Sequence, residues 1–111
     1  MLVADHIQIL LCSNPIDMRK GADGLAGLIR DALNDEPLSG KIFVFQSKSG
    51  DRVKLLYWHF NGFAVWSKRI QQGRFRFPKE NQNGTVSLTR SALRMILEGI
   101  DFESLQKKKS A

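Results

Sequence analysis

The chain has 111 residues and a formal net charge of +6. This length fits one domain with a single core. No apolar run approaches the roughly 20 residues that a membrane-spanning helix needs, and the first ten residues lack the basic start of a signal peptide. We therefore expect a cytoplasmic protein with no membrane partner. Cys12 is the one cysteine, which excludes an internal disulfide and a zinc site built on cysteines, so we expect it to be a small buried residue on a strand.

The positive charge is concentrated in the middle of the chain. Residues 1–40 carry a net charge of −3, residues 41–79 carry +8 and residues 80–111 carry +1, which together give the total of +6. A basic segment of this kind is typical of proteins that meet a polyanion.

The first forty residues predict a strand and then a helix. Residues 7–12 (IQILLC) do not alternate, which indicates a strand buried on both faces, and Pro15 follows its end. Residues 15–35 have apolar side chains at intervals of three and four, which predicts a helix with one buried stripe. Gly21, Gly24 and Gly27 weaken this helix, and they indicate either a close approach by another backbone or ligand, or simply a weak first turn.

Residues 41–78 predict an antiparallel meander. Four runs of β-branched and aromatic residues are separated by turn-forming residues at 47–50, 61–62 and 71–73. A two-residue hairpin loop at Asn61-Gly62 would pair Phe60 with Phe63 and Trp58 with Val65.

Extending that register divides the side chains of the meander between two faces. The apolar face, which we expect the first helix to cover, holds Ile42, Val44, Val53, Leu55, Tyr57, Ala64, Trp66, Ile70, Phe75 and Phe77, with Lys68 as its one charge. The other face mixes aromatic and cationic side chains: Phe43, Phe45, Lys54, Leu56, Trp58, Phe63, Val65, Arg69, Arg74 and Arg76.

After the meander, residues 79–85 predict a polar loop. Thr89 is a candidate N-cap for a second helix that ends at Gly99, and Ile100 and Phe102 would pack back on the body. The whole prediction is an α+β domain over residues 1–102, with about four to five antiparallel strands, one helix before them and one after them. Residues 103–111 predict a disordered basic tail.

Three segments in this order and spacing resemble a known family. They are residues 15–29 (PIDMRKGADGLAGLI), the meander with GDRVKLLYW, GFAVWSKRI and GRFRFP, and residues 88–102 (LTRSALRMILEGIDF). They look like the accessory proteins encoded by the second open reading frame of the sixty-six family of bacterial insertion sequences, often labelled TnpB. The resemblance implies a part in DNA transposition beside a separate transposase, and it brings no established biochemical activity.

The mixed face of the meander is the candidate nucleic-acid surface. Its cations would release counterions from DNA phosphates, and Trp58, Phe63 or Phe43 could stack on unpaired bases. The candidate residues are Lys54, Arg69, Arg74, Arg76, Trp58 and Phe63. A solvated basic surface, with the aromatics covered by the second helix, is the alternative.

Arg19 and Lys20 are candidate phosphate-binding residues if the first helix begins near Pro15 or Met18. The favoured alternative is that Arg19 pairs with Asp17 or Asp23 and positions the turn.

Nothing in the sequence predicts catalysis or a cofactor. The acids of the first helix mostly lie on its solvated side, and no spacing of metal ligands or phosphate-loop motif is present. We therefore expect a noncatalytic accessory protein that binds DNA with weak sequence specificity and acts with the transposase of its element. The alternative is a protein-interaction adaptor, in which Trp58, Phe43 and Phe63 bind the transposase or a second copy of the chain.

Overall fold

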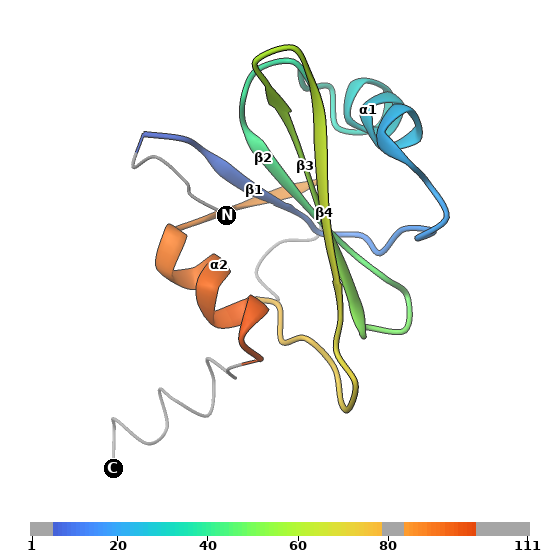
Figure 1. Ribbon diagram of the computed structural model, residues 1–111, viewed down its shortest axis with the longest axis vertical. Helices are drawn as coiled ribbons and strands as arrows, with labels where there is room; N and C mark the ends of the chain where they lie inside the picture. Colours follow the sequence, from blue (N-terminus) through green and yellow to red (C-terminus); the bar gives the residue numbers. More distant parts are fainter. Residues whose placement is uncertain (1–5, 79–83, 100–111) are drawn as a thin grey trace.

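The computed structural model describes residues 6–78 and 84–99. The elements follow one another as β1 (Ile9–Cys12), α1 (Ala22–Asp31), β2 (Ile42–Gln46), β3 (Arg52–His59), β4 (Gly62–Arg69), β5 (Thr85–Leu88) and α2 (Arg90–Leu97). The strands form one sheet in the order β4-β3-β2-β1-β5, and the two helices lie on opposite sides of it (Figure 1). The predicted α+β class is confirmed. The predicted packing of Ile100 and Phe102, the domain end at residue 102 and the basic tail lie outside the described residues.

The sheet is mixed, whereas the sequence predicted antiparallel strands alone. β2, β3 and β4 form the predicted meander, β1 pairs with β2 in parallel, and β5 pairs with β1 in antiparallel. The parallel pair arises because the connection through α1 returns the chain to the end of the sheet at which β1 begins. β1 is buried as predicted, and Cys12 lies on it with 2% of its surface exposed.

The fourth run of the predicted meander is not a strand. β4 is an edge of the sheet, and the segment after it turns across the β2–β3 turn instead of pairing beside β4. The backbone amide of Ile70 donates to the carbonyl of Asp51, and that of Phe75 donates to the carbonyl of Gly50. Phe75 is buried in the core, so burial of its ring takes the place of strand pairing.

The β3–β4 hairpin differs from the predicted register by two residues. Its loop is Phe60-Asn61, and the observed pairs include Trp58 with Phe63 and Arg52 with Arg69. Phe60 takes the positive φ of the turn, at 61°. Because side chains alternate with a period of two, a shift of two leaves every side chain on its predicted face.

Both faces of the sheet are buried, and this overturns the predicted arrangement of the helices. The predicted apolar face forms one core with Leu93 and Ile96, which come from α2. The opposite face forms a second core, in which Phe43, Phe45 and Leu56 pack with Leu25, Ala26 and Ile29 of α1. The first helix therefore covers the face that the sequence assigned to nucleic acid. Sequence alternation indicated two faces but could not tell which helix each one meets.

The helix starts are set by short-range contacts. α2 begins as predicted, because the hydroxyl of Thr89 accepts a hydrogen bond from the amide of Ala92, and Gly99 follows its end with a φ of 78°. α1 begins later than expected, with Gly21 as an N-cap that has no side-chain hydrogen bond. A Cβ added at Gly21 or Gly27 would meet nothing within 4 Å, so no described backbone approaches these two glycines.

Among the described residues, no helix is long and apolar enough to cross a membrane.

Candidate nucleic-acid interface

Four cations gather where the β2–β3 turn meets the end of β4. Arg52 and Arg69 lie directly opposite each other on adjacent strands, and Arg74 lays its side chain over Gly50. Lys48 is in the same turn. The segments that follow β2 and β4 therefore meet at one end of the sheet, opposite the hairpin tip (Figure 1). We call Lys48, Arg52, Arg69 and Arg74 the turn-end cluster.

Asp51 is the acid within this cluster. The hydroxyl of Ser49 donates to its carboxylate, and Nε of Arg69 lies 3.7 Å from Oδ2. The hydrogen bond from Ser49, followed by a bond from the backbone amide of Asp51 itself and then by the charges of Arg69 and Arg52, holds the pKa of Asp51 below its ordinary value despite desolvation. Asp51 is therefore ionised at neutral pH and offsets part of the charge of Arg69. One carboxylate leaves the four cations of the cluster with a positive balance.

Arg76 is exposed, as predicted, on the extended segment after the cluster. Its neighbours Phe75 and Phe77 pack toward the core that α2 covers. Arg76 thus projects from a segment that its neighbours anchor to the body.

The side chain of Lys54 forms hydrogen bonds within the protein. Its ammonium donates to the backbone carbonyls of Met18 (2.7 Å) and Lys20 (2.9 Å). These two bonds fasten the segment that leads into α1 to the middle of β3. Two of the three ammonium donors are therefore occupied within the chain.

The predicted aromatic residues lie apart from the turn-end cluster. Trp58 and Phe63 face each other edge to face, with ring centroids 5.1 Å apart, and Phe63 also packs against the core under α1. The Trp58–Phe63 pair is six residues along β3 from the Arg52–Arg69 pair, or about 20 Å at the usual rise of a strand. Phe43 is fully buried, so its predicted role as a stacking or docking residue is wrong. The mixed surface therefore separates into a cationic end and an aromatic end.

Arg19 is held by Asp17, which is the alternative that the sequence favoured. Its guanidinium donates to both carboxylate oxygens, with the shortest contact at 2.7 Å, and its backbone amide also donates to Oδ1. These bonds to Arg19 lower the pKa of Asp17. Lys20 is exposed just before the N-cap of α1. A phosphate-binding role for either residue stays a prediction.

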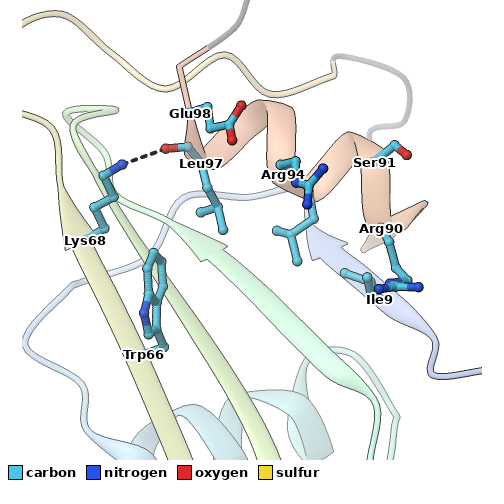
Figure 2. Close-up of a pocket in the computed structure, with 9 residues that line it drawn as sticks. Ile9, Trp66, Lys68, Arg90, Ser91, Arg94, Leu97 and Glu98 are labelled. Atoms are coloured by element: carbon cyan, nitrogen blue, oxygen red, sulfur yellow. Dashed lines mark hydrogen bonds between the residues drawn. The ribbon is translucent and has the colours of Figure 1, made fainter. Parts of the chain in front are cut away.

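A second basic site, which the sequence did not indicate, lies on the other face of the sheet between α2 and β4. It is a pocket of about 520 Å³ (Figure 2). Trp66 and Lys68 come from β4, and most of the remaining lining comes from α2: Arg90, Ser91, Leu93, Arg94 and Leu97, with Glu98 and Ile9 completing it. Two signals could have pointed to it, namely Lys68 as the one charge on an apolar face and the four-residue spacing of Arg90 and Arg94.

The described residues contain no group of three or more His, Cys, Asp or Glu that could hold a metal ion. Burial raises the pKa of the Cys12 thiol to about 12, so this sulfur is protonated at neutral pH.

Comparisons with known proteins agree with the resemblance in the sequence. A family model described as "IS66 Orf2 like protein" matches residues 7–107. The uncharacterized protein y4jC of Sinorhizobium fredii is 30% identical over 102 residues, which cover 92% of this chain and 86% of the relative. The uncharacterized protein y4hO of the same organism is 30% identical over 101 residues, covering 91% and 87%. No solved structure matches the chain.

Proposed function

Because the chain belongs to the IS66 Orf2 like family, and so is an accessory protein of an insertion sequence, we propose that it supports DNA transposition without catalysing it, by binding DNA through the turn-end cluster. Arg76 extends this surface along the segment that leaves the sheet. The transposase of the same element is the expected protein partner.

The observation that carries this proposal is the direct opposition of Arg52 and Arg69. Like charges on opposed positions of adjacent strands destabilise a sheet. The carboxylate of Asp51 lies 3.7 Å from Nε of Arg69, and the side chain of Arg69 is 63% exposed. A phosphate backbone would supply more negative charge than Asp51 alone provides, and counterions of the DNA would be released.

The arrangement of the turn-end cluster suits contacts with DNA phosphates more than contacts with bases. No helix of the described chain projects from the turn-end cluster toward a major groove, and the cluster consists of side chains from strand ends and turns. We therefore expect weak sequence specificity.

The test is DNA binding by fluorescence anisotropy at several salt concentrations, on the full chain and a labelled duplex. If all four cations of the cluster contact phosphates, the slope of log K against log salt is about −3.6, and a fourfold rise in salt weakens binding about 150-fold. The double variant Arg52→Gln/Arg74→Gln should reduce the slope to about −1.8, so that the same rise weakens binding about 12-fold.

Arg30→Gln is the matched control, because Arg30 is an exposed arginine on α1. It should bind the duplex like the wild type. Equal slopes for wild type and the double variant, with unchanged circular dichroism, would reject the turn-end cluster as the DNA surface.

A protein-interaction adaptor remains the second candidate, now centred on the hairpin tip. Phe60 is 83% exposed and has a positive φ, an uncommon combination for a bulky residue. Trp58 and Phe63 lie next to it on β3 and β4. Pull-down of the transposase after nuclease treatment separates the two functions: a direct contact survives and is weakened by Phe60→Ser, whereas a DNA bridge is lost.

A further inference from the structure

The pocket between α2 and β4 combines an apolar floor with a cationic rim. Trp66 packs on the core under α2, and Leu97 and Leu93 line the pocket beside it. In Figure 2, Trp66 and Lys68 stand on one side of the opening and the side chains of α2 on the other. A ligand that fits must therefore offer a flat or apolar part and a negative charge.

The charges around the pocket differ along α2. At its C-terminal end, the ammonium of Lys68 donates to the carbonyl of Leu97 at 2.8 Å, and Glu98 also lines the pocket. The exposed helix carbonyls and Glu98 offset the charge of Lys68 there. Arg94 also lines the pocket, from the last turn of α2, and its guanidinium makes no comparable contact with a carbonyl or carboxylate of the described residues. Negative charge on a ligand is therefore best placed beside Arg94.

We propose that this pocket binds an unstacked nucleotide, with its base against Trp66 and its phosphate at Arg94. The volume of about 520 Å³ is within the usual range of small-molecule sites. Stacking of a base on an aromatic side chain, together with a cation for the phosphate, is how proteins hold single-stranded nucleic acid. The site is separate from the turn-end cluster, because Trp66 and Lys68 point to the opposite face of the sheet from Arg69.

The shape of the pocket distinguishes this ligand from a peptide. Its strand residues are Trp66 and Lys68 of β4 and Ile9 of β1, and its helix wall spans residues 90–98. A docked peptide segment would need a groove along several residues of both walls. The chain's own basic residues, Lys107 to Lys109, have the same sign of charge as the rim, which disfavours the C-terminal segment as the occupant.

The inference rests on the proposed function only in that DNA supplies the nucleotide, and its test is independent of duplex binding. The full chain, labelled with ¹⁵N, is titrated with deoxyadenosine monophosphate and followed by two-dimensional NMR. The chain has two tryptophans, so the indole N–H of Trp58 is an internal reference for that of Trp66. We expect saturable shifts of the Trp66 indole and of the amides of α2, with the Trp58 indole unmoved.

Partial ligands and variants identify the contacts. Adenosine and inorganic phosphate should each bind at least 10-fold more weakly than the nucleotide. Trp66→Leu should weaken nucleotide binding about 5-fold to 150-fold, whereas Trp66→Phe should retain most of it because a phenyl ring still stacks. Arg94→Gln should weaken binding of the nucleotide and leave adenosine unchanged, and Arg30→Gln should change neither.

Three results would overturn the proposal. The first is the absence of saturable shifts at the Trp66 indole. The second is an equal response to inorganic phosphate, which would mean an adventitious ion only. The third is tighter binding of a hexaglutamate peptide than of the nucleotide, which would make the pocket a docking site for acidic protein segments. If the nucleotide binds while the wild type shows no salt-dependent duplex binding, the proposed function fails and this inference stands. If the wild type binds the duplex in a salt-dependent way and does not bind the nucleotide, this inference is rejected and the proposed function stands.

Discussion

Replacing Lys54 by methionine tests whether this lysine serves the fold or DNA. Its ammonium bonds to the carbonyls of Met18 and Lys20 at 2.7 and 2.9 Å. A hydrogen bond from a charged group contributes about 1.5–3 kcal/mol, and the lower end applies here because one of the two bonds is exposed. The freed carbonyls would also find water. We therefore expect Lys54→Met to lower the free energy of unfolding by about 2 kcal/mol.

The assay is urea unfolding, with duplex binding measured in parallel. The midpoint should fall while the slope of log K against log salt stays that of the wild type, since an ammonium bound to two carbonyls has little left for a phosphate. Lys54→Arg, which keeps the charge but changes the geometry, serves as the comparison. The reasoning is refuted if Lys54→Met leaves the midpoint unchanged and lowers the magnitude of the salt slope by about 0.9, the value for one phosphate contact.

Three further substitutions test the fold. Phe43→Ala should lower the free energy of unfolding by about 3–5 kcal/mol, because Phe43 is fully buried under α1, and a loss under 1 kcal/mol in urea unfolding would contradict that burial. Phe60→Gly should raise it by about 0.5 kcal/mol, because glycine adopts the φ of 61° without strain, and a lower midpoint would speak against the turn. Thr89→Ala should lower it by about 1 kcal/mol through the lost cap to Ala92, measured against Thr89→Ser, which keeps the hydroxyl.

The thiol of Cys12 gives a chemical test of the sheet. Since its pKa is raised to about 12 and it is buried, a disulfide reagent at pH 8 should modify it only as fast as the chain opens, and in urea the reaction should become fast. Rapid modification of the folded chain would contradict the buried position on β1.

The alternation of side chains was predictable from sequence because it depends on local geometry. Val53, Leu55 and Trp66 were assigned to the face that is indeed a core, even though the hairpin register was two residues off. The sequence favoured Asn61-Gly62 as the turn, and the structure instead places Phe60 in the strained position. A shift of two is invisible to a pattern of period two.

The partners of the elements could not be predicted in the same way. β5 is four residues long and exists through its pairing with β1, more than seventy residues earlier in the chain. The burial of Phe43 under α1 also depends on contacts distant in sequence. On the face concerned, Lys54 and Arg69 alternate with apolar residues and make it look exposed, yet Lys54 bonds to the segment before α1. A lysine that fastens a helix is indistinguishable in sequence from one that meets solvent.

At the candidate site, too, the positions of residues along the strands were predictable and their contacts were not. The cations of the middle of the chain do gather, but at the end of the sheet, and the aromatic residues gather at the other end. Their positions along β3 were readable from the sequence. Which of them stay accessible was not, because it depends on α1, which packs on Phe43 and Phe63, and on the segment before α1, which binds Lys54.

The edge position of β4 has a consequence for how copies of this protein behave in solution. An eight-residue edge strand offers its outer backbone groups to any other strand, and Val65 adds an exposed apolar side chain. Two copies that approach through this edge repel each other, because each chain carries a net charge of +6. High salt screens that repulsion, so concentrated samples in high salt should self-associate through this strand, whereas dilute samples in low salt should stay monomeric.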